Sequence, residues 1–323
     1  MLPTPTFYEE RHAKEVYIER AGLVADQARD FRAAHGIRPA GQDDFKIAAF
    51  GIDCQIGFIH PEASLAVPGA VEDTQRTLRW LYGNLDRITG LHFSMDTHRV
   101  FQIFHPAWWS DKDGNPPPPF TVIRSADVEA GTWTPIRHPR ECLEYTRKLE
   151  ETGKYVLTVW PYHTLLGGVS HALMPAFMEA AIFHAIARDR QTHFETKGTH
   201  AMTENFSVMS PEVTELGGQS VGAFNAPFFK MLMEYDRIYI FGQAKSHCVL
   251  STLRDIRTHI EKSDPGLASK VHILEDATSP VPPPPLDPLP PDLDFPAVAE
   301  RAFKDLAAAG MNIVKTTDPI DLP

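Results

Sequence analysis

The sequence is poor in cysteine and has no run of positive charge. Its 323 residues include only Cys54, Cys142 and Cys248, too few for a disulfide framework. The formal net charge is −11 and Lys and Arg form no cluster, which argues against nucleic acid or an anionic membrane as a partner. No apolar stretch has the length of a membrane span, and the first twenty residues are too charged for a signal peptide. We therefore expect a soluble, cytoplasmic protein.

Short apolar runs alternate with helical patterns along most of the chain, and 43% of the residues are hydrophobic, enough for a full core. The predicted strands are residues 46–53, 90–95, 155–159, 193–197, 237–241, 271–275 and 312–315. The predicted helices are residues 69–87, 140–152, 226–234, 246–262 and 296–309. The predicted strands are short, apolar and mostly not alternating, which is typical of strands covered on both faces. The pattern predicts an α/β protein with a mostly parallel sheet and helices on both faces.

We expect residues 41–323 to form a single domain, preceded by an N-terminal extension. The extension, residues 1–40, is charged and helical in pattern over 8–35, and would lie on the domain or on a partner subunit. Residues 106–153 carry four consecutive prolines and three tryptophans, and we interpret them as an insert that forms a long surface excursion. We interpret the proline-rich residues 280–291 as a stiff connector to the last helix.

Cys248 follows an apolar run that stops at Gly242 and gives way to a helical pattern. This places the thiol at the start of a helix, where the helix dipole and backbone N–H groups favour the thiolate. Asp53 and Lys197 follow two other predicted strands in the same way. Because the carboxyl ends of parallel strands meet at one edge of a sheet, the three side chains should converge there. A thiol, a carboxylate and an amine together predict an activated cysteine nucleophile, with Asp53 as the base.

A second group of residues suits a metal ion. Asp96 and His98 are two residues apart on an extended segment, so both side chains can face one ion. His163 follows another predicted strand, and His105 is a further candidate ligand. One carboxylate and two imidazoles leave coordination positions open for water or substrate, as in catalytic metal sites. The same ligand set suits the Fe(II) of a non-haem oxygenase, but that hypothesis gives the cysteine and the lysine no role.

Six segments, in chain order, resemble motifs of the nicotinamidase/pyrazinamidase branch of the isochorismatase-like cysteine hydrolases. The segments are Asp53-Cys54-Gln55 with Phe58, residues 64–70, Asp96-Thr97-His98, Trp160-Pro161-Tyr162-His163, Lys197-Gly198 and residues 242–249. The resemblance runs from about residue 46 to residue 276. It implies a three-layer, isochorismatase-like (Rossmann-like) fold with a six-stranded sheet, and a catalytic triad of Asp53, Lys197 and Cys248.

The resemblance also implies the other parts of a site. Asp96, His98 and His163 would hold one divalent ion, with zinc as the first expectation and iron or manganese as alternatives. Backbone N–H groups of Ala244 and Cys248 would form an oxyanion hole, with a cis peptide before Ala244. The side chains expected to line a pocket for a flat ring are Phe58, Leu65, Trp160, Phe206 and His247, and aromatic walls suit such a ligand.

The implied function is that of a metal-dependent amidohydrolase. It would cleave a small aromatic carboxamide, nicotinamide first, to an acid and ammonia through a thioester. Hydrolysis of another amide or a ureido compound by the same triad is the main alternative, and an oxygenase or a non-catalytic binding module are the others. The chain departs from the family in the insert, in Thr164 where many relatives have cysteine, in an added helix within residues 167–190 and in its extended termini. The insert could change the shape of the pocket and therefore the substrate. The N-terminal extension and the added helix suggest contacts between subunits of a homo-oligomer.

Overall fold

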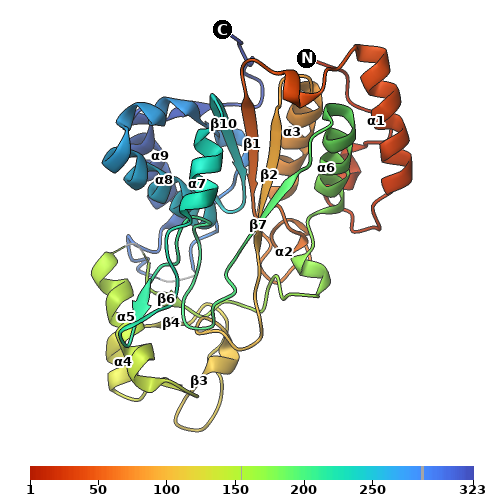
Figure 1. Ribbon diagram of the computed structural model, residues 1–323. Coiled ribbons are helices and arrows are strands. Elements are labelled where there is room, and N and C mark those ends of the chain that lie inside the picture. The colour runs from red at the N-terminus through yellow and green to blue at the C-terminus, as the bar shows by residue number, and fades with distance from the viewer. Residues whose placement is uncertain (154, 285–286) are drawn as a thin grey trace.

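The computed structural model describes residues 1–153, 155–284 and 287–323. At its centre is a six-stranded sheet in the order β12-β11-β10-β1-β2-β7 (Figure 1). Its strands are β1 (Ile47–Ile52), β2 (Gly90–Asp96), β7 (His193–Lys197), β10 (Arg237–Gly242), β11 (Val271–Leu274) and β12 (Asn312–Val314). Each neighbouring pair is parallel, so all carboxyl ends lie at one edge. The predicted parallel α/β sheet is confirmed.

Helices cover both faces of this sheet (Figure 1). One layer contains α1 (Ala21–His35), α3 (Ala70–Gly83) and α6 (Pro175–Arg188), and the other contains α7 (Ala226–Met233), α8 (Leu250–Ser263) and α9 (Phe295–Ala308). In β1, Ile47 and Ala49 pack into the core of the first layer, whereas Ala48, Phe50 and Ile52 pack into that of the second. Successive side chains of a strand point to opposite faces, so a strand buried on both sides must be apolar throughout.

The prediction of a main-sheet strand at residues 155–159 is wrong. Only β6 (Leu157–Thr158) forms there, and it pairs antiparallel with β4 (Val122–Ile123) outside the main sheet. The place beside β2 is occupied by β7, with His92 opposite His193. The sixth strand is instead β12, at the opposite edge of the sheet. An apolar run of five residues does not by itself determine which sheet it joins.

The insert is a folded unit rather than a surface excursion, which corrects the interpretation from sequence. Its elements are β3 (Trp109–Ser110), β4, α4 (Ser125–Glu129), β5 (Thr134–Pro135) and α5 (Pro139–Thr152). They surround a hydrophobic cluster of their own in which Trp108, Trp109 and Tyr145 are buried. In Figure 1 this unit lies below the carboxyl edge of the sheet. It packs against the hairpin of β8 (Glu215–Leu216) and β9 (Gln219–Ser220), since Leu216 belongs to the same cluster.

The N-terminal residues contain two helical segments rather than one continuous pattern. A 3₁₀ turn (Glu10–Ala13) is followed by extended residues and then by α1, which packs on α6. The buried carboxylate of Glu179 in α6 accepts hydrogen bonds from the Arg20 guanidinium and from the Tyr17 hydroxyl. The connector predicted at 280–291 includes residues 285–286, which lie outside the described residues. Among the described residues, no helix has the length and apolarity needed to cross a bilayer.

Candidate active site

The three residues predicted as a triad meet at the carboxyl edge of the sheet. Asp53 directly follows β1, Lys197 ends β7, and Cys248 lies in a π-helical turn (Lys245–Val249) that leads into α8. The Lys197 Nζ atom is 2.9 Å from Asp53 Oδ2 and donates to Cys248 Sγ at 3.7 Å. All three side chains are buried. Strand β2 separates β1 from β7, so the long lysine side chain spans the distance that a shorter cation would not.

The protonation of this group follows from its burial. Burial raises the pKa of the Cys248 thiol well above its usual range, although Lys197 opposes the shift. The start of a helix is expected to lower the pKa of a thiol, so the effect of burial is the opposite one. The thiol therefore needs a base to ionise it. Burial also raises the pKa of Asp53. Burial would lower the pKa of Lys197, but Asp53 and Asp96 outweigh it and raise the pKa, which keeps the ammonium charged.

Ser94 is a residue of the candidate site that the sequence motifs did not indicate. Its hydroxyl donates to Asp53 Oδ1 at 2.6 Å and accepts from the Asp53 backbone N–H at 3.0 Å. These two bonds fix the carboxylate with its other oxygen toward Lys197. The signal was present in the sequence: Ser94 is two residues before Asp96 within β2, so the two side chains share one face of the sheet.

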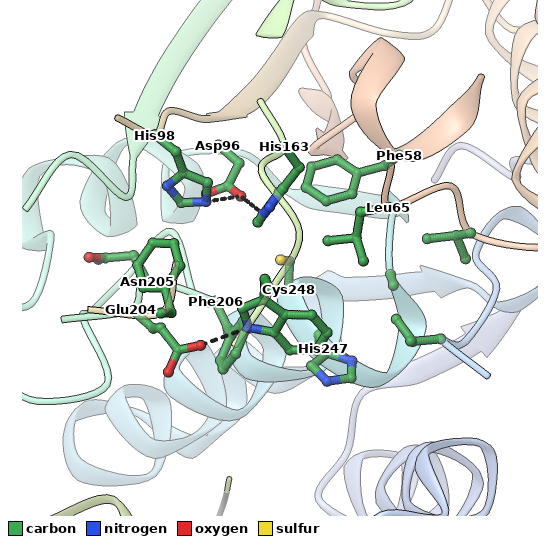
Figure 2. Close-up of a pocket in the computed structure, with 15 residues that line it drawn as sticks. Phe58, Leu65, Asp96, His98, His163, Glu204, Asn205, Phe206, His247 and Cys248 are labelled. Carbon is green, nitrogen blue, oxygen red and sulfur yellow. Dashed lines mark hydrogen bonds and ion pairs between the residues drawn. The ribbon is translucent and has the colours of Figure 1, made fainter. Parts of the chain in front are cut away.

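The predicted metal ligands also come together. Asp96, His98 and His163 are buried, and each offers one ligand atom within 4.8 Å of the other two. Asp96 Oδ2 is 2.8 Å from His98 Nε2 and 3.6 Å from His163 Nε2, and Figure 2 shows both imidazoles turned toward this oxygen. Each histidine donates its Nδ1–H to a backbone carbonyl, His98 to Gly198 and His163 to Pro161, so Nε2 is the ring nitrogen that each turns toward Asp96. Backbone partners of this kind orient metal-bound imidazoles, so the three residues fit a divalent ion.

Asp96 connects the candidate metal site with the triad. Its Oδ1 atom accepts from Lys197 Nζ at 2.8 Å, while Oδ2 faces the imidazoles. Burial alone would raise the pKa of Asp96, but His98 and Lys197 hold it well below its usual range. Gly198 makes this approach possible, because a Cβ atom there would lie 2.8 Å from both Asp96 Oδ1 and His98 Cε1, at a φ of +79°.

His105, the fourth candidate ligand, is not part of this group. Its ring centroid is 5.7 Å from that of His98 and 5.9 Å from that of His163. Its Nδ1–H donates to the Arg99 carbonyl at 3.0 Å, and burial lowers its pKa to about 3. His105 is therefore a neutral imidazole beside the three residues, and its buried Nε2 has no hydrogen-bond partner among the described residues. Its role as a further ligand stays a prediction.

A cavity opens beside the thiol. All five residues predicted to form a ring pocket line it, together with Ala244 and Cys248 (Figure 2). The five are Phe58, Leu65, Trp160, Phe206 and His247. The Gln243–Ala244 peptide is cis, as the resemblance implied. Burial lowers the pKa of His247 to about 3, so this ring is a neutral, largely apolar wall. The cavity suits a flat, uncharged ring next to the thiol and the candidate metal site.

Glu204 is a second residue that the sequence reasoning missed. It is buried and lines the cavity, although it belongs to an irregular segment after β7. Its carboxyl group accepts from Trp160 Nε1 at 2.9 Å and from the Tyr145 hydroxyl at 3.0 Å (Figure 2 draws the first bond). Burial raises its pKa to about 8. Glu204 therefore fixes the indole of the pocket wall to helix α5 of the insert.

Comparison with known proteins identifies the fold. No protein-family model matches the chain, and no curated protein matches it in sequence. Solved structures do match. A nicotinamidase/pyrazinamidase from Acinetobacter baumanii aligns with a TM-score of 0.53 at 17% identity, over 85% of this chain and 99% of the other. The yeast nicotinamidase aligns with a TM-score of 0.52 at 18% identity, over 83% of this chain and 99% of its own.

The yeast nicotinamidase bound to the inhibitor nicotinaldehyde aligns equally well, with a TM-score of 0.52 at 18% identity. The chain thus has the α/β fold of the nicotinamidase/pyrazinamidase structures, as the resemblance in its motifs implied. At these identities the likeness shows the fold alone.

Proposed function

We propose that the protein is a metal-dependent cysteine amidohydrolase that cleaves a small aromatic carboxamide to the acid and ammonia. One observation carries the proposal: a buried thiol, carboxylate and ammonium meet beside an Asp-His-His group, under one apolar cavity. Nicotinamide is the first substrate to test. Two of the structurally similar proteins are nicotinamidases by name, which supports this choice.

In the first half-reaction, Cys248 attacks the amide carbonyl as its proton passes to Asp53. The raised pKa of Asp53 suits a carboxylate that must accept and hold a proton. Lys197 stays cationic and stabilises the negative charge that develops on sulfur. The backbone N–H groups of Ala244 and Cys248 hold the oxyanion, an interaction worth roughly 3–4 kcal/mol of barrier. Asp53 then returns the proton to the leaving nitrogen, and ammonia departs to give a thioester.

In the second half-reaction, Asp53 takes a proton from water, whose oxygen attacks the thioester carbonyl. The carbon–sulfur bond breaks, the acid is released, and the sulfur recovers the proton held by Asp53. Ser94 keeps one oxygen of Asp53 occupied in both halves, so that the other serves the proton transfers. A carboxylate used twice needs this fixed orientation.

Asp96, His98 and His163 would hold the divalent ion, with zinc preferred and iron or manganese as alternatives. When bound, the ion supplies a Lewis-acidic point that holds a ring nitrogen of the substrate, or a water molecule, next to the cavity. The three protein ligands leave coordination positions for this purpose.

Ammonia release tests the proposal directly. Purified protein loaded with zinc should release ammonia from nicotinamide, and Cys248→Ala should abolish the release. Cys142→Ala is the matched control, because Cys142 is also a buried thiol but lies in the core of the insert. Release by Cys248→Ala at the wild-type rate would refute the proposed nucleophile. Oxygen uptake without ammonia would point instead to an Fe(II) oxygenase at the Asp-His-His group.

A further inference from the structure

A second cavity adjoins the ring pocket. Leu65, Trp160 and Val281 line both cavities, so the two meet along these three side chains. The far side of the second cavity comes from the insert, through Phe120 and Val122, and from residues 282–284 of the proline-rich segment. We refer to this second cavity as the vestibule. A ring bound beside Cys248 therefore has further space along one edge.

The walls of the vestibule are apolar. Ser64 and Thr158 are its only polar lining residues among those described, and the Ser64 hydroxyl is already used, because it donates to the Tyr162 carbonyl at 2.6 Å. No charged residue of the described chain lines it. By contrast, a third cavity, which shares Trp160, Phe206 and His247 with the ring pocket, has the charged residues Arg124, Glu150 and Asp292 in its lining. The vestibule is the compartment that suits an uncharged group.

Phe120 indicates that the vestibule can contact a bound ligand. It is a large aromatic residue, yet it is 49% exposed. Its backbone N–H donates to the Val159 carbonyl, and its ring meets the Trp160 ring edge-on at 6.0 Å. The ring is thus held in the wall of the vestibule, against Trp160, with about half of the residue uncovered by protein. Burial of such a surface by a ligand is favourable.

We propose that the physiological substrate is an aromatic carboxamide whose ring carries an uncharged apolar substituent, and that this substituent lies in the vestibule. The proposal rests on the proposed amide hydrolysis at Cys248, because that chemistry fixes the orientation of the ring. The insert and the proline-rich segment then act as specificity elements. The substrate is larger than nicotinamide itself.

The test compares nicotinamide with nicotinamides that carry a butyl or phenyl group at each ring position away from the amide. We expect the best extended compound to have a kcat/KM for ammonia release at least about tenfold higher, since one methylene in an apolar pocket changes kcat/KM by about that factor. A butyl chain that ends in a carboxylate should lose the gain. If nicotinamide is hydrolysed as fast as every extended compound, the inference is overturned.

Two variants locate the effect. Phe120→Ala should lower kcat/KM for the best extended compound several-fold more than for nicotinamide. Phe101→Ala is the matched control, because Phe101 belongs to the same part of the chain and is 48% exposed but does not line the vestibule. Equal changes in selectivity from both variants would contradict the assignment.

Binding separates this inference from the proposed function. Titration calorimetry with Cys248→Ala measures the affinity for the same compounds without turnover. If an extended compound binds at least about tenfold more tightly than nicotinamide, the vestibule holds the substituent, whether or not the wild-type protein releases ammonia. The absence of ammonia release would refute only the proposed hydrolase activity. Equal affinities for nicotinamide and every extended compound would refute the vestibule alone.

Discussion

Replacing Lys197 with methionine should destabilise the fold as well as stop turnover. The ammonium is 2.9 Å from Asp53 Oδ2 and 2.8 Å from Asp96 Oδ1, and it also donates to the Asn205 carbonyl at 2.9 Å. Its side chain is only 2% exposed. Methionine has a similar length but no charge, so it leaves two buried carboxylates without their shared cation. Breaking a buried pair in this way costs about 3–5 kcal/mol.

Urea unfolding of chelated protein at pH 7.5 measures this cost. Lys245→Met is the control, because Lys245 is also buried but its partner Glu300 is 63% exposed, and such a pair contributes at most about 1 kcal/mol. Asp53→Asn added to Lys197→Met should recover about 1–3 kcal/mol, since it removes one of the stranded charges. If Lys197→Met and Lys245→Met cost the same, Lys197 does not offset the two carboxylates and this reasoning fails.

Three other predictions follow from the site. Excess zinc should raise the melting temperature, because an ion present at 100 times its Kd adds about 2.7 kcal/mol to the free energy of unfolding. His98→Ala should abolish this rise, whereas the control His35→Ala, at an exposed position, should keep it. Gly198→Ala should lose zinc in equilibrium dialysis, since its Cβ would collide with Asp96; zinc retained at wild-type stoichiometry would contradict the close packing. Burial raises the pKa of Glu204 to about 8, so the folded protein binds that proton more tightly than the unfolded chain. Its contribution is present at acid pH and is lost as pH rises toward 8, by up to about 1.4 kcal/mol per pH unit, and urea unfolding of Glu204→Gln should lack this slope.

The candidate active-site edge of the sheet was predictable from sequence because it depends on local pattern. Asp53 follows the apolar run of β1, Lys197 ends the short edge strand β7, and Cys248 follows the turn after the apolar run of β10. In a parallel sheet these ends must share an edge, so the convergence of side chains far apart in the chain followed from topology alone. The protonation of Cys248 did not follow, because it depends on how deeply the thiol is buried, which no local pattern reports.

The insert was not predictable for a related reason. Its tryptophans and prolines excluded a regular strand, but its core forms from contacts between its own short elements and the distant Leu216. Residues 155–159 had the composition of a buried strand and nevertheless joined the insert, because β7 pairs with β2 over five residues. Competition between strands for one edge is decided by the total pairing and packing of the sheet, not by the composition of one segment.

Glu204 shows where this limit affects function. It lies in a segment without periodicity, and its partners Trp160 and Tyr145 are 44 and 59 residues away in the chain. Only the folded insert brings the three together, and only then does a carboxyl group become part of the cavity wall. The sequence therefore predicts which residues meet around Cys248, because they lie at or just after strand ends, while the shape of the cavity depends on how the insert packs. Substrate selection should accordingly change with substitutions in the insert, while the chemical step remains at the strand ends.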